Sequence, residues 1–275
     1  MSADLEGITG VVHGQELTAG TGSWNEARRW MTADVVAAAE GAMAAGATEV
    51  VVADGHAGMR NLIFDELPAG VVAHRGPAAG RTMCQVEGLD GSFACVLLVG
   101  YHSMAGTDGI LSHTWHGGVV AQFRLNGMPI GETAITAAVA GFHGVPVVLA
   151  TGDQYLAAEA SAVVPGITIV TVKETTGRQN ARCLTTATTG PMIRTASEAA
   201  VRGRGTVAPL RTPAPVTIEI DTLSHRQADR IERFRPVERV DVRTVRIVAN
   251  DVPGAFEQAW LAVEVADFEA GTWNQ

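Results

Sequence analysis

The stretch Thr48-Glu-Val-Val-Val-Ala-Asp-Gly-His56 decides the predicted fold, because a run of β-branched residues ends there in polar side chains. A strand that is apolar at consecutive positions is typical of burial on both faces of a sheet. Ala94-Cys-Val-Leu-Leu-Val-Gly100 repeats the pattern, and shorter apolar runs cover 146–150 and 167–172. We therefore expect several strands in the interior of one sheet.

Segments with helical spacing of small apolar residues separate these strands. They cover residues 25–46, 132–142 and 154–163, and Gly46 is suited to end the first of them. A further helix is expected at 193–203. Alternating strands and helices favour an α/β fold, with a mostly parallel sheet flanked by helices on both faces.

The pattern changes in the C-terminal part of the chain. Three prolines between residues 209 and 215 indicate a connector. Beyond it the order is a strand at 216–220, a helix at 227–234, a strand at 244–248 and a helix at 255–268. We expect an α/β metal-binding catalytic domain at 1–207 and a smaller α+β portion at 208–275. Residues 119–125, followed by Asn126-Gly127, predict one arm of a hairpin.

Composition narrows the possible partners. The chain has 275 residues, of which 47% are hydrophobic, so it can bury a large core. Its formal net charge is -9 and no Lys/Arg run stands out, which argues against nucleic acid as a partner. The three cysteines lack the spacing of a metal site. No secretory segment and no apolar run of membrane-spanning length is visible, so we expect a cytoplasmic protein without a membrane partner.

The first seven residues, Met1-Ser-Ala-Asp-Leu-Glu-Gly7, place two carboxylates at the end of a short predicted strand. Asp4 and Glu6 are two residues apart, and on an extended backbone such side chains point the same way. Gly7 would let the backbone turn away. Taken alone, the pair is better explained by a solvated surface turn. The positions of the histidines favour a metal site.

His56 and His102 each follow a predicted buried strand at its C-terminal end, as Asp4 and Glu6 follow the first. In open parallel sheets, ligands bind outside the carboxyl ends of the strands. Glu132 opens a predicted helix, where a carboxylate is locally favoured. Three strands would thus deliver polar side chains to the same edge of the sheet.

The five residues together have the composition of a zinc site, since Zn²⁺ binds imidazole and carboxylate. Three carboxylates and two imidazoles exceed what one catalytic zinc needs, and they suit two Zn²⁺ ions that share a bridging carboxylate. Each histidine alone would be explained as a hydrogen-bonded loop residue. We expect the metal ligands to be Asp4, Glu6, His56, His102 and Glu132.

His113 and His116 lie in Leu111-Ser-His-Thr-Trp-His-Gly117, beyond the strand that carries His102. They could be further ligands, but a histidine beside a metal site also suits a general acid or base. Asp54 could orient a ligating imidazole or cap the turn that follows it. For the lining of a substrate pocket, the sequence offers Met104, Trp115 and Phe142 as candidates.

Several blocks together resemble the zinc-dependent D-aminopeptidase family of the dipeptide-transport-operon type, from the start of the chain to about residue 200. The blocks are SADLEGITG, VVADGHAGMRN, QVEGLDGSFACVLLVGYHSMAG, SHTW and PIGETAITAAVAGFHGVPVVLATGD. The resemblance implies a dinuclear zinc site with Asp4 as the bridge, and Glu6, His56, His102 and Glu132 as the other ligands. It implies His113 as the catalytic residue, and a self-compartmentalising homodecamer of two stacked pentameric rings.

We therefore expect a metal-dependent hydrolase of amide or peptide bonds, an aminopeptidase that releases N-terminal D-amino acids from a small peptide or amide substrate. One alternative is a zinc amidohydrolase that acts on a small non-peptide amide or hydrazide. Two others are a metal-dependent phosphoesterase and a non-enzymatic small-molecule binding protein. The residues alone do not separate action of His113 as an acid or base from its direct attack on the carbonyl carbon.

Overall fold

A seven-stranded sheet forms the larger part of the computed structural model, which describes residues 1–76 and 81–267. Its strand order is β3-β2-β1-β4-β7-β8-β9, and every neighbouring pair is parallel except the β8–β9 hairpin. The strands are β1 (Ser2–Ala3), β2 (Val50–Asp54), β3 (Val71–His74), β4 (Val96–Val99), β7 (Val147–Asp153), β8 (Thr168–Gly177) and β9 (Asn180–Cys183). The predicted α/β class with a mostly parallel sheet is confirmed.

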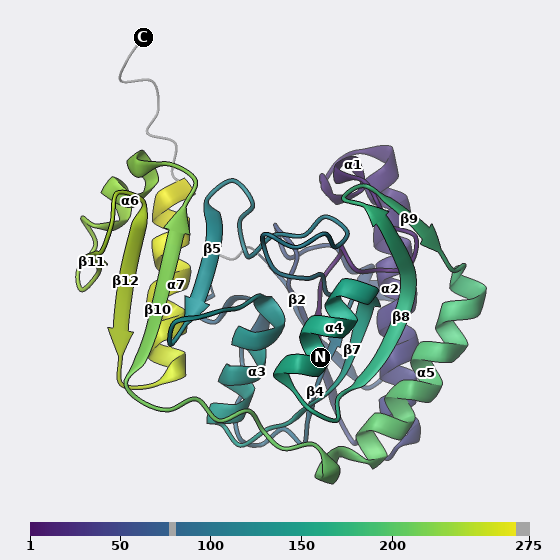
Figure 1. Cartoon of the computed structure of the whole chain (residues 1–275). Helices are drawn as coiled ribbons and strands as arrows, with labels where there is room; N and C mark the ends of the chain where they lie inside the picture. Colours follow the sequence, from purple (N-terminus) through teal and green to yellow (C-terminus); the bar gives the residue numbers. More distant parts are fainter. Residues whose placement is uncertain (77–80, 268–275) are drawn as a thin grey trace.

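Helices cover both faces of this sheet (Figure 1). The long helices α2 (Gly22–Ala44) and α5 (Thr186–Arg202) pack against each other on one side. The helices α3 (Glu132–Phe142) and α4 (Gln154–Val163) lie on the other side, and α4 packs on β7 and β8. Every residue of β4 and β7 is buried, as the continuous apolar runs predict for strands covered on both faces.

A second, antiparallel sheet has the order β11-β12-β10-β5-β6 and packs against α7 (Val252–Asp267). Its strands are β5 (Val120–Leu125), β6 (Met128–Pro129), β10 (Val216–Thr222), β11 (Glu238–Arg239) and β12 (Thr244–Ala249), with α6 (His225–Ile231) after β10. The predicted hairpin is found as β5–β6, with Asn126 and Gly127 at positive φ in its turn. Since β5 and β6 come from before residue 207, this sheet combines both predicted parts of the chain, and a boundary at 207/208 stays a prediction.

Among the described residues, no helix combines the length and the apolar character needed to cross a membrane.

The short strand β1 determines where the N-terminal loop lies. Ser2 and Ala3 pair with β2 on one side and with β4 on the other, so β1 lies in the interior of the sheet. Asp4 and the residues after it therefore leave the sheet between the ends of the strands that precede His56 and His102. Gly7 then packs on the turn after β4, where its N–H donates to the Gly100 carbonyl oxygen over 2.8 Å.

We predict that Gly7→Ala displaces this loop. A Cβ at Gly7 would lie 1.8 Å from the carbonyl oxygen of Tyr101, so the backbone would have to move. We expect the free energy of unfolding to fall by about 1–3 kcal/mol, as for other overpacked sites. Gly22→Ala is the control, because a Cβ there meets nothing within 4 Å. Thermal unfolding measures both variants, and equal midpoints would contradict the close approach.

Candidate metal centre

The structure brings the five predicted metal ligands together at the carboxyl ends of three adjacent strands. Asp4 follows β1, His56 lies two residues beyond β2, and His102 lies three residues beyond β4. Glu132 is the first residue of α3, which points its N-terminus toward the same place. All five side chains are buried, and they are Asp4, Glu6, His56, His102 and Glu132.

These side chains form two groups that share Asp4. Its Oδ1 lies 3.5 Å from Nδ1 of His56, and its Oδ2 lies 3.3 Å from Nε2 of His102. Glu6 Oε2 is 3.1 Å from the His56 nitrogen. Glu132 Oε1 is 3.3 Å from the His102 nitrogen. Each imidazole therefore faces one oxygen of Asp4 and one further carboxylate.

Backbone carbonyl groups orient the imidazole rings from behind. The Leu17 carbonyl oxygen, at the end of helix α1 (Gly14–Leu17), lies 3.2 Å from Nε2 of His56. The Ser103 carbonyl oxygen lies 3.0 Å from Nδ1 of His102. Because a carbonyl oxygen accepts and cannot donate, these outer nitrogens carry the hydrogen in the neutral ring. The inner nitrogens then present lone pairs, which is the usual arrangement of ligating histidines.

The electrostatics of the site are those of buried acids held beside imidazoles. Burial alone would raise the pKa of Asp4, but its contacts with His102 and His56 hold that pKa well below its usual range. Burial lowers the pKa of both histidines, yet Glu6 and Glu132, together with Asp4, raise it well above the ordinary value. Without a cation, protons on the two imidazoles balance the carboxylates, and a bound metal would displace those protons.

The donor set fits zinc in its chemistry. Oδ2 of Asp4 and Nε2 of His102 have no hydrogen-bond partner among the described residues, although 3.3 Å separates them. Buried polar atoms without hydrogen-bond partners are rare, and they often indicate the site of an ion or a water molecule. Carboxylate oxygens and imidazole nitrogens are ligands that Zn²⁺ prefers. A cation between these atoms would satisfy both.

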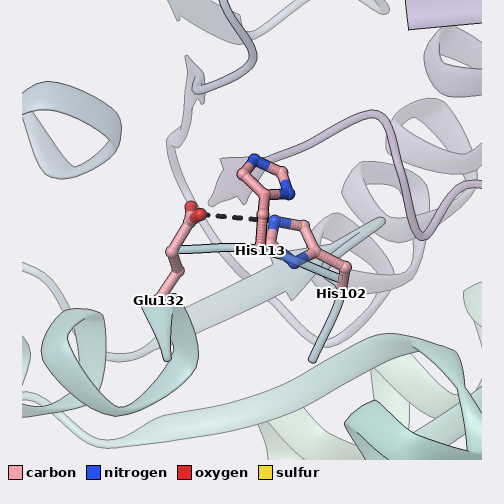
Figure 2. A group of neighbouring side chains, drawn as sticks. All are labelled: His102, His113 and Glu132. Carbon is pink, nitrogen blue, oxygen red and sulfur yellow. Dashed lines mark ion pairs between the residues drawn. The ribbon is translucent and has the colours of Figure 1, made fainter. Parts of the chain in front are cut away.

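His113 lies directly against this centre. Its ring stacks on that of His102, with centroids 4.2 Å apart and an interplanar angle of 12° (Figure 2). Nδ1 lies 3.0 Å from the Leu111 carbonyl oxygen, which leaves Nε2 as the free nitrogen, 3.9 Å from Oε1 of Glu6. Ligand atoms of His102, His113 and Glu132 also lie within 4.8 Å of one another. The geometry is therefore compatible with both roles that the sequence leaves open for His113, as a further metal ligand or as a general acid or base.

The neighbouring candidates have other contacts. His116 is more exposed, and its Nε2 lies 3.2 Å from Oδ1 of Asp267. Asp54 does not touch the His56 ring. Its carboxylate accepts from the backbone N–H groups of Asn61 and Leu62 and from the Asn61 amide, which also donates to the His56 carbonyl oxygen. Of the two roles predicted for Asp54, orienting an imidazole or capping the following turn, the structure shows the cap of the turn.

A cavity of about 320 Å³ opens beside the centre. One wall is polar and includes Asp4, His56, His113 and Glu132. The apolar wall is built from Met59, Cys84, Trp115 and Trp260. Trp115 was predicted as a lining residue, whereas Met104 and Phe142 do not line this cavity. Trp260 comes from α7, so the helix that packs against the second sheet contributes to the same cavity.

A buried lysine supports the loop that carries Glu6, and the sequence pattern gave no such role to it. Lys173 is 1% exposed, and its Nζ donates to the carbonyl oxygens of Glu6 and Val11. Burial lowers the pKa of this lysine to about 8. Its position directly after the apolar run that ends at Val172 is the one local signal that could have pointed to it.

Comparisons with known proteins identify the family of the chain. The family model described as D-aminopeptidase matches residues 1–261. A D-aminopeptidase of Bacillus subtilis (strain 168) is 32% identical over 267 residues, which is 97% of this chain and 96% of the relative. A solved structure titled Zn-dependent D-aminopeptidase DppA from Bacillus subtilis, a self-compartmentalizing protease, superimposes with a TM-score of 0.94 at 31% identity, and the match covers 98% of both chains. The chain belongs to the D-aminopeptidase family.

Proposed function

We propose that this protein is a zinc-dependent aminopeptidase that releases N-terminal D-amino acids through two Zn²⁺ ions. In this proposal Asp4 bridges the two ions. Glu6 and His56 hold the first ion, and His102 and Glu132 hold the second. The proposal is carried by the position of the Asp4 carboxylate. One of its oxygens lies 3.5 Å from the His56 ring nitrogen, and the other lies 3.3 Å from the His102 ring nitrogen. A bridging carboxylate is typical of hydrolases with two metals.

Zinc, when bound, would supply Lewis-acid polarisation of a substrate carbonyl group and would lower the pKa of a bound water to about 7. His113 supplies the proton chemistry. Its Nδ1–H is held by the Leu111 carbonyl oxygen, so Nε2 can take a proton from the attacking water and deliver it to the leaving amine. Attack by the same nitrogen on the carbonyl carbon would instead break the C–N bond and form an acyl-imidazole, while the amine leaves with a proton from water; hydrolysis of the acyl-imidazole would then free the imidazole. Both routes need a neutral, oriented ring.

The assembly is part of the proposal. The solved relative is titled a self-compartmentalizing protease, and the match covers 98% of each chain. We infer that this chain also assembles with copies of itself, as a homodecamer in the cytoplasm. Light scattering on the purified protein would then give ten times the mass of one chain.

A second candidate is a zinc amidohydrolase that acts on a small non-peptide amide or hydrazide. The observation in its favour is the charge of the cavity. Among the described residues that line it, none is lysine or arginine. A dipeptide that places its free carboxylate inside the cavity would find no guanidinium or ammonium partner there.

We predict chelator-sensitive hydrolysis in a panel of D- and L-aminoacyl amides, D- and L-dipeptides, and small acyl hydrazides. The proposed function predicts release of the N-terminal D-residue, abolished by chelator and restored by Zn²⁺. Turnover of the hydrazides alone would favour the second candidate. A protein that binds zinc and turns over nothing in the panel would contradict both.

Asp4→Asn should lose metal and activity together, because a neutral amide cannot bridge two cations as a carboxylate does. Elemental analysis after dialysis is expected to find two Zn²⁺ per wild-type chain and at most one in the variant. Asp65→Asn is the matched control, since Asp65 is an exposed carboxylate. Unchanged stoichiometry in Asp4→Asn would remove Asp4 from the bridging role.

His113→Ala should keep its zinc and lose most of its turnover. We expect kcat to fall by at least about 100-fold, which is the usual contribution of a positioned acid or base. His225→Ala serves as the control, because His225 is exposed at the start of α6, outside the cavity lining. Loss of zinc from His113→Ala would make His113 a ligand instead.

A further inference from the structure

We propose that Arg178, in the turn of the β8–β9 hairpin, is a positioning residue for His113. The inference rests on the role of His113 proposed above and adds the part of the chain that holds it. Arg178 is exposed and does not line the cavity. It would therefore act through the loop that carries His113 and not on the substrate.

The hairpin turn is hydrogen-bonded to Leu111 and Ser112, the two residues directly before His113. The guanidinium Nη1 of Arg178 donates to the carbonyl oxygen of Ser112 and, over 3.1 Å, to its hydroxyl oxygen. The Arg178 carbonyl oxygen accepts from the N–H of Leu111 over 2.9 Å. Arg178 thus donates to the carbonyl oxygen of Ser112, 66 residues away in the chain, and accepts from the N–H of the neighbouring Leu111.

Leu111, which is hydrogen-bonded to Arg178, also orients the His113 imidazole. Its φ is +49°, in the left-handed region that a leucine rarely adopts. Such a backbone persists only where its surroundings enforce it. In this conformation the Leu111 carbonyl oxygen lies 3.0 Å from Nδ1 of His113. The Leu111–Ser112 peptide group, whose carbonyl oxygen fixes the tautomer and direction of the His113 ring, is therefore held from both sides. The Arg178 carbonyl oxygen binds the N–H of Leu111, and the Arg178 guanidinium binds the carbonyl oxygen of Ser112.

Other hydrogen bonds also anchor this loop, and directly after His113 the Thr114 hydroxyl oxygen accepts from the N–H of Ala105 over 3.1 Å. Asp153 Oδ2 accepts from the N–H of Ile110 over 2.8 Å, and the Ser112 hydroxyl donates to the Thr107 carbonyl oxygen. Within the described residues, Arg178 is the side chain that donates to the Ser112 carbonyl oxygen, next to His113. Its removal should loosen the His113 end of the loop and leave the Ile110 end in place.

The test compares Arg178→Met and Arg178→Lys with Arg182→Met. Arg182 is on the same hairpin, is exposed and pairs with Glu174, so it controls for a change of charge there. In Arg178→Met we expect kcat to fall about 10- to 100-fold, the size expected for a misplaced catalytic group, while KM and zinc content stay near those of the wild type. Arg178→Lys should recover part of kcat, because an ammonium can still donate to the Ser112 carbonyl oxygen.

Hydrogen exchange supplies a readout that does not depend on activity. The peptide that contains Leu111 and His113 should exchange faster in Arg178→Met than in Arg182→Met, with and without zinc. Equal exchange in the two variants would overturn the inference, even if the wild type hydrolysed nothing in the substrate panel. In an active enzyme, an unchanged kcat in Arg178→Met would overturn it as well, and so would a loss that lysine does not relieve.

Discussion

Three buried carboxylates that face two imidazoles are the constraint on which the site depends. Buried charges are costly unless an opposite charge lies beside them. Asp4 stands at the centre, because its two oxygens divide between His56 and His102. Such a cluster needs cations, and in their absence protons on the imidazoles supply the positive charge. The position of β1 between β2 and β4 thus brings this cluster of charges together at the ends of the interior strands.

The loops that carry these side chains are held by polar groups from distant parts of the chain. Lys173 in β8 binds the carbonyl oxygen of Glu6, and Asp54 caps the turn that begins at His56. Arg178 binds the residues before His113. Each of these buried or partly buried polar side chains binds backbone groups of a loop, and together they hold the proposed metal ligands and the candidate catalytic ring in position.

Much of the fold could be predicted, since it depends on local patterns. Continuous apolar runs predicted most of the interior strands. Polar residues just beyond predicted strands, together with Glu132 at a predicted helix start, indicated the five clustered side chains. Other features depend on contacts between distant residues. β9 lies in a Thr/Gly-rich stretch and forms because β8 continues to Gly177, beyond its apolar run, and pairs with it. α5 begins at Thr186, before the predicted start, with Pro191 inside it. No local spacing brings Trp260 to the cavity or Arg178 to the His113 loop.

The proposed pair of zinc ions that share Asp4 can be located by anomalous X-ray diffraction at the zinc edge on crystals of the zinc-loaded protein. We expect two peaks on either side of the Asp4 carboxylate. Glu6 and His56 would contact one peak, and His102 and Glu132 the other. A single peak, or one bound through His113 in place of Asp4, would contradict it.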